Sequence, residues 1–128
     1  MLPTQLEVFL MELEITPEAA ARFPENYQLY IITSNDGSNQ FSSAAGCCMI
    51  GERFLITPIT EPLPRYSEVV SSNRFTFFTS TYDQMFLTGH LILTVHPTSG
   101  TLILKNEGGY LDNNLMLEKE PQITTVES

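Results

Sequence analysis

Apolar and polar residues alternate most clearly between Gln84 and Val95. The odd-numbered positions of this stretch are apolar or small, whereas the even-numbered positions are mainly polar. Because side chains on a strand point alternately to opposite faces, the pattern predicts a long strand with one core face and one partly solvated face. A loop of turn-forming residues follows at 96–101, and the alternation resumes at Leu102 and Leu104, which predicts a β-hairpin.

Segments dense in aromatic and β-branched residues predict further strands at 27–33, 53–59 and 74–81. A tight turn is expected at Tyr82-Asp83, so that 74–81, 84–95 and 101–105 form an antiparallel meander. The small apolar residues of 41–50 indicate a central strand or a tight packing seam. Two segments stay ambiguous: 66–72 is a helical turn or a loop, and 110–117 is a fourth strand or a closing helix.

Short helices are predicted at the N-terminus. Thr4 and Glu7 have capping-box spacing, and apolar residues recur at helical spacing up to Leu13, which favours a helix over about 5–13. The alternation of Leu13 and Ile15 with acidic residues leaves a strand as the rival. A second helix is predicted at 17–23, because Thr16 can cap it, Pro17 suits its first position and Pro24 ends it.

The predicted fold is therefore α+β and β-rich. It consists of an antiparallel sheet or small barrel of roughly five to seven strands, with a C-terminal meander and one or two short N-terminal helices. The length of 128 residues suits one domain. We expect that domain to span 1–118, and the polar, acidic residues 119–128 to form a flexible tail.

Charge changes the picture of possible partners. The net charge is −9, from 6 basic and 15 acidic residues, and the acidic residues dominate at both ends of the chain. Such a chain repels nucleic acid and anionic lipid, and favours a basic protein surface. No apolar run is long enough to span a membrane, and the first residues lack the basic start of a secretory signal. We expect a cytoplasmic protein without membrane insertion.

Candidate chemistry is sparse. His90 and His96 lie on one strand about 20 Å apart and cannot share a metal ion. The two cysteines, Cys47 and Cys48, are adjacent and flanked by small apolar residues, which favours buried packing over a reactive thiol. No serine nucleophile elbow, zinc-binding cysteine pairs or dinucleotide fingerprint occurs. The sequence therefore predicts no metal, no cofactor and, on balance, no enzyme.

The favoured hypothesis is a non-enzymatic, cytosolic protein-binding module: an adaptor, inhibitor or assembly factor. An exposed sheet edge also allows a homodimer. One alternative is a small-ligand-binding β-barrel. The other is a small α+β enzyme that uses His90 with Asp83 or a tyrosine. The candidate partner-binding residues are those of the mixed strand face and two N-terminal acids: Phe86, Thr88, His90, Ile92, Thr94, Glu7 and Glu12.

Overall fold

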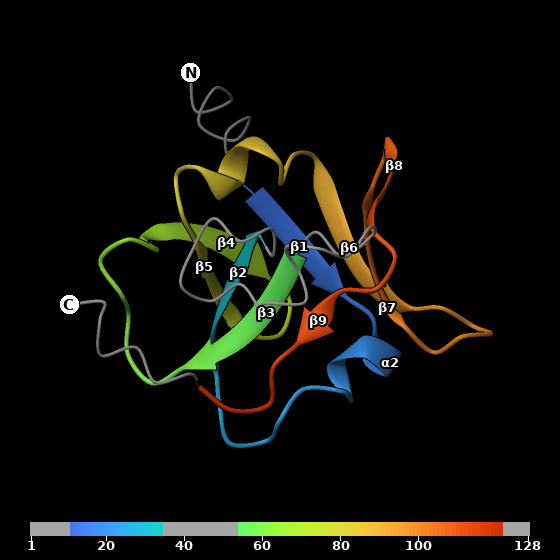
Figure 1. The fold of residues 1–128 in the computed structure, drawn as a ribbon, viewed down its shortest axis with the longest axis horizontal. Coiled ribbons are helices and arrows are strands. Elements are labelled where there is room, and N and C mark those ends of the chain that lie inside the picture. The colour runs from blue at the N-terminus through green and yellow to red at the C-terminus, as the bar shows by residue number, and fades with distance from the viewer. Residues whose placement is uncertain (1–10, 35–53, 122–128) are drawn as a thin grey trace.

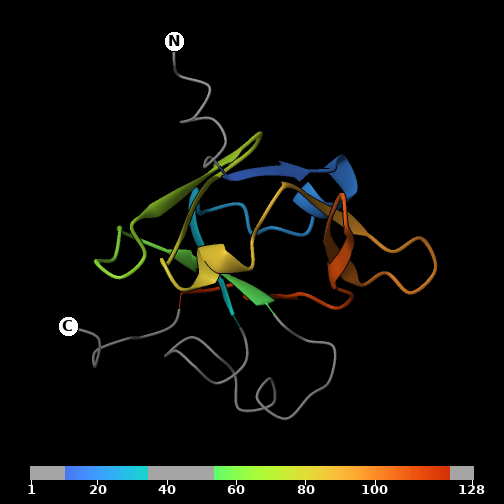
Figure 2. The ribbon, with the colours of Figure 1, turned by 90° about the horizontal axis from the view of Figure 1, so that it is seen from above.

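A computed structural model describes residues 11–34 and 54–121, which form a curved mixed sheet with very little helix (Figure 1). In this part of the chain the sheet has nine strands, in the order β8-β7-β6-β1-β4-β5-β2-β3-β9. Seen from above, the sheet curls into a half-barrel (Figure 2). The strands are β1 (Met11–Ile15), β2 (Leu29–Ser34), β3 (Phe54–Ile59), β4 (Glu68–Ser72), β5 (Thr76–Thr79), β6 (His90–Val95), β7 (Leu102–Asn106), β8 (Gly109–Asp112) and β9 (Met116–Leu117).

The prediction of a β-rich fold is confirmed, but the sheet differs from the prediction in strand number and direction. Four of its strand pairs are parallel: β1 with β4, β1 with β6, β2 with β5, and β3 with β9. Parallel neighbours need long crossover connections, which leave no local signal in the sequence. An antiparallel sheet was therefore the wrong prediction for the middle of the molecule.

β1 occupies the middle of the sheet, between β4 and β6. The helix predicted over 5–13 is wrong from Met11 onward, and the rival strand is correct. Burial alternates strictly along β1, with Met11, Leu13 and Ile15 buried and the two glutamates between them exposed. The earlier part of the predicted helix, including Glu7, lies outside the described residues.

Within residues 11–34 and 54–121, helix is confined to two short pieces. α2 (Pro17–Ala20) begins as predicted, with the Ala19 N–H donating to Thr16 Oγ1 at 3.3 Å, but it ends before Phe23. The second piece is the 3₁₀ helix η2 (Asp83–Met85). It replaces the first part of the long predicted strand, so Met85 is 68% exposed rather than a core residue.

The predicted meander is correct only in its second half. β6 and β7 form the expected antiparallel hairpin, closed by the His96 N–H donating to the Thr101 carbonyl at 2.8 Å. β5, however, pairs with β2 and β4, and both β4 and β1 lie between it and β6. The ambiguous segments are also strands, because 66–72 contains β4 and 110–117 contains most of β8 and all of β9.

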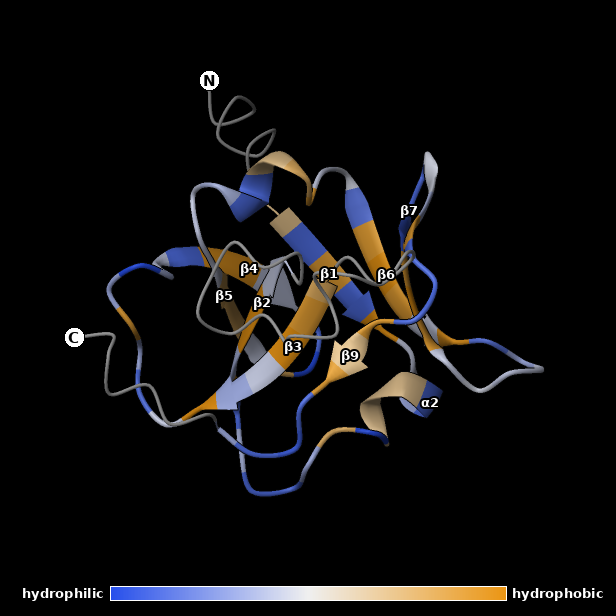
Figure 3. Cartoon of the chain, viewed as in Figure 1, coloured by the Kyte–Doolittle hydropathy of each residue, from blue (hydrophilic) through white to orange (hydrophobic). Residues whose placement is uncertain are grey.

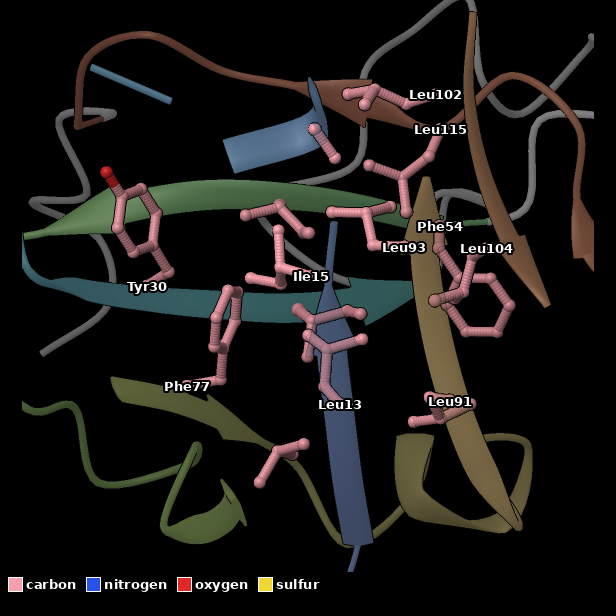
Figure 4. Close-up of a cluster of buried hydrophobic side chains, with 14 of the residues drawn as sticks. Leu13, Ile15, Tyr30, Phe54, Phe77, Leu91, Leu93, Leu102, Leu104 and Leu115 are labelled. Atoms are coloured by element: carbon pink, nitrogen blue, oxygen red, sulfur yellow. The ribbon is translucent and has the colours of Figure 1, made fainter. Parts of the chain in front are cut away.

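The main hydrophobic core lies on the inner face of the half-barrel, where the close-up shows its side chains among the strands (Figure 4). Hydrophobic residues recur along β3 and β6 (Figure 3). Leu13, Leu91 and Leu93 contribute from the central strands, and Tyr30 stacks on Phe77 with ring centroids 5.6 Å apart. A second, smaller cluster lies on the opposite face of β2 and β3. Within 11–34 and 54–121, no helix is long and apolar enough to cross a membrane.

Candidate functional site

A histidine lies between two carboxylates on the outer face of the sheet. The parallel register of β1 and β6 places Glu12 opposite His90, and Glu14 follows on the same face. His90 Nδ1 is 3.4 Å from Glu12 Oε1, and Nε2 is 3.0 Å from Glu14 Oε1. A neutral imidazole has only one N–H, so both contacts are hydrogen bonds only when the ring is protonated. The carboxylates of Glu14 and then Glu12 accordingly raise the pKa of His90.

A third carboxylate approaches the same strand from the β7–β8 turn. The backbone N–H of His90 donates to both oxygens of Glu107, at 3.1 and 3.2 Å. Hydrogen bonds from its own backbone N–H and from that of His90 lower the pKa of Glu107. The carboxylate also occupies the space where a side chain at Gly89 would lie. Glu107 therefore fixes the start of β6.

The histidine and the two β1 glutamates border a shallow hollow of about 400 Å³. The imidazole lies between the glutamates, so the carboxylates do not converge on one point where a cation could bind. In the described residues, no group of three or more His, Cys, Asp and Glu side chains is arranged to hold a metal ion. The rest of the lining comes from Leu13, Ser71, Ser72 and Asn73.

The structure separates the predicted binding residues into two groups. His90, Ile92 and Thr94 lie in β6, with Glu12 beside them. Phe86 and Thr88 precede the strand, and Phe86 is 44% exposed, with its ring edge-on to Tyr82 at 5.4 Å. Glu7 lies outside the described residues.

Sequence reasoning missed Glu14, although it named Glu12. A strand over 11–15 puts both glutamates on one face, so the signal was present in the alternation of acids with Leu13 and Ile15. The helix predicted over 5–13 concealed it. The contact with His90 depends on the β1–β6 register, which no local pattern encodes.

Asp83 belongs to a different network from His90. Its buried carboxylate accepts hydrogen bonds from Thr33 Oγ1, the Ser34 N–H at 3.1 Å, Ser34 Oγ at 2.6 Å and Ser80 Oγ at 2.7 Å. These donors fix the carboxylate beside the end of β2. The structure therefore does not bring Asp83 and His90 together as the acid–base pair of the enzyme alternative.

A second buried carboxylate lies beside the start of β3. Asp112 accepts from the Phe54 N–H at 2.8 Å and the Asn114 N–H at 2.9 Å. Phe54 is the ladder partner of Ser34. Asp83 and Asp112 therefore bond to the two residues that bound segment 35–53, which contains both cysteines and lies outside the described residues.

Comparison with known proteins gives one family. The sequence model of a family described as iron-sulphur cluster biosynthesis matches residues 11–119. No curated protein matches the chain. Two similar crystal structures are of proteins described as Fe-S biosynthesis proteins. One, from Lactobacillus acidophilus, has 17% identity over 85% of this chain and 90% of that chain, with a TM-score of 0.68. The other, from Lactobacillus salivarius, has 18% identity over 88% and 100%, with a TM-score of 0.69.

These findings correct the predicted function. At 17% and 18% identity, the two crystal structures establish a shared fold. The family match overturns the generic protein-binding module, which rested on acidic ends and a half-apolar strand face. Those features recur in proteins of many functions and do not distinguish among them. Because the match extends over every described strand, the chain belongs to the iron–sulphur cluster biosynthesis family.

Proposed function

We propose that the protein acts in the assembly or trafficking of iron–sulphur clusters, with iron or a cluster as its cargo. The observation that carries this proposal is the family match over residues 11–119. The similarity in fold to two proteins described as Fe-S biosynthesis proteins supports it.

Cys47 and Cys48 are the cargo ligands that we propose. Thiolates are the usual ligands of iron–sulphur clusters, and these are the only cysteines in the sequence. The histidine–glutamate contacts on β1 and β6 do not form an alternative metal site, because the imidazole separates the carboxylates. The described residues therefore contain no site that competes with the thiols for a metal ion.

The donor set of one chain does not fit a complete cluster. Common clusters are held by four cysteine thiolates, and one chain supplies two. We propose that a second copy of the chain, or the protein that receives the cargo, supplies the remaining ligands. A cluster bound in this way is shared and exchangeable, which suits a protein that passes its cargo on.

Anaerobic reconstitution with ferrous iron and sulfide tests the proposed function. We expect the wild type to bind iron and sulfide and to gain thiolate-to-iron absorption in the visible range. Cys47→Ser and Cys48→Ser are each expected to lose most of the bound iron. Met85→Ser, which removes an exposed sulfur-containing side chain, is the control and should bind as the wild type does. A wild-type protein that binds neither iron nor sulfide would overturn the proposal.

A further inference from the structure

Two basic residues line a second hollow, at the turn end of the β6–β7 hairpin. Arg22 follows α2 and Lys119 follows β9, and both border a space of about 300 Å³. The hairpin turn contributes Gly100 and Thr101 to the lining, and the connection from β8 to β9 contributes Asn114. Segments far apart in the sequence thus bring two cations to one depression, which we call the cationic hollow.

Backbone carbonyl oxygens, rather than carboxylates, hold the two cations. Arg22 Nη2 donates to the Gly100 carbonyl at 2.7 Å, and Lys119 Nζ donates to the Arg22 carbonyl at 2.5 Å. The ion pairs found within residues 11–34 and 54–121 both involve His90, on the outer face of the sheet. Guanidinium and ammonium groups have more N–H donors than the one that each uses here. Both side chains therefore keep donors and positive charge for a ligand.

The charge of the cationic hollow is opposite to that of the whole chain, which is −9. Glu118 and Glu120 adjoin Lys119 in the sequence, but no Asp or Glu is among the described residues that line the hollow. The two cations repel each other, and an anion bound between them replaces that repulsion by attraction. The acidic surface opposes such an anion only weakly at physiological ionic strength, because charges more than about 8 Å away are largely screened.

The rest of the lining is apolar. Leu102 and Leu115 are 5% and 4% exposed, and Leu117 is half-buried beside them. Pockets for small molecules combine such apolar walls with a few polar groups that orient the ligand, in volumes from about 300 Å³ upward. The lining therefore suits a ligand with an anionic head and an apolar body.

We propose that the cationic hollow binds a small organic phosphate monoester, with the phosphate between Arg22 and Lys119 and the organic part against the leucines. A phosphate monoester carries a charge of about −1.5 to −2 at pH 7, which matches two monovalent cations better than a carboxylate does. The arginine fork also suits paired hydrogen bonds to phosphate oxygens. This site shares no residue with the proposed thiol ligands, so the inference goes beyond the proposed function and does not depend on it.

NMR titration of the cargo-free chain with phenyl phosphate tests the proposal. We expect saturable shifts of the backbone amides of Thr101, Leu102 and Leu115. Phenyl phosphate should bind about tenfold more tightly than benzoate, which has one negative charge, and than inorganic phosphate, which has no apolar part. Binding of benzoate as tight as that of phenyl phosphate would overturn the phosphate head group, and equal binding of inorganic phosphate would overturn the role of the leucines.

Variants locate the binding. Arg22→Gln and Lys119→Gln remove one cation each from the exposed rim, and each should weaken the binding of phenyl phosphate about tenfold. Arg65→Gln and Lys105→Gln are the matched controls, because they make the same changes of charge at residues that do not line the hollow. They should bind as the wild type does.

A wild type without saturable shifts would overturn the proposal, as would equal losses of affinity in the matched controls. The amide spectrum of each variant also shows whether the fold is kept. No iron or sulfide is present in these titrations, so their failure leaves the proposed function unaffected, and a failure of iron binding leaves this inference unaffected.

Discussion

At the scale of single residues, His90 gives the protein a pH-dependent charge on the outer face of the sheet. The carboxylates of Glu14 and then Glu12 raise its pKa above the ordinary value of 6.5. A raised pKa in the folded state means that the protonated ring stabilises the fold. This contribution is complete below about pH 6.5, the unfolded value, and is lost as pH rises through the higher folded pKa.

NMR titration of the imidazole checks this expectation. In the wild type we expect the pKa of His90 to exceed 6.5, with both ring nitrogens protonated well below it. Glu14→Gln should lower the pKa most, and Glu12→Gln less, in the order of their contributions. Glu18→Gln, an exposed change in α2, is the control. A wild-type pKa at or below 6.5 would contradict the arrangement of the three side chains.

Gly89 supports a second prediction at this scale. Its φ of +82° is in the left-handed region, and the Glu107 carboxylate fills the position of a Cβ. We expect Gly89→Ala to lower the free energy of unfolding by about 1–2 kcal/mol from backbone strain alone. Gly108→Ala, where φ is not left-handed and the nearest atom lies at 3.4 Å, should cost much less. Urea denaturation measures the free energy of unfolding of both variants. Equal losses would contradict the prediction that the left-handed backbone at position 89 requires glycine.

At the scale of elements, local sequence patterns predicted the elements that depend on contacts between residues close in the sequence. The β6–β7 hairpin follows from alternation and a short turn, and α2 from the Thr16 cap and Pro17. The position of β1 between β4 and β6 follows from long-range parallel pairing, which no window of sequence reveals. The contact of Glu12 with His90 was missed for the same reason. The family relationship was equally hidden, because it rests on a match over residues 11–119 that no single local pattern reveals.

The strand interpretation of β1 makes a prediction of its own. Leu13 is 2% exposed on the inner face, whereas Glu12 points outward beside it. We expect Leu13→Ala to lower the free energy of unfolding by about 2–5 kcal/mol, because it leaves a cavity in the main core. Glu12→Gln should change it by less than about 0.5 kcal/mol. Guanidinium denaturation compares the two, and similar small effects would contradict a core position for β1.

At the scale of the whole molecule, we expect the proposed cargo and the net charge to act in opposite directions on association. Each chain carries a charge of −9, so two empty chains repel each other, most strongly at low ionic strength. If the proposed cargo is a cluster held by four thiolates, it would draw together two copies that supply two each. We expect the 14.4 kDa chain to elute as a monomer without cargo and at twice that mass after anaerobic reconstitution. Light scattering measures this mass, and loss of the dimer in Cys47→Ser would tie association to the thiols.

Raising the ionic strength to about 0.15 M should strengthen the loaded dimer by screening the repulsion. A loaded protein that remains a monomer would instead assign the missing ligands to a different partner.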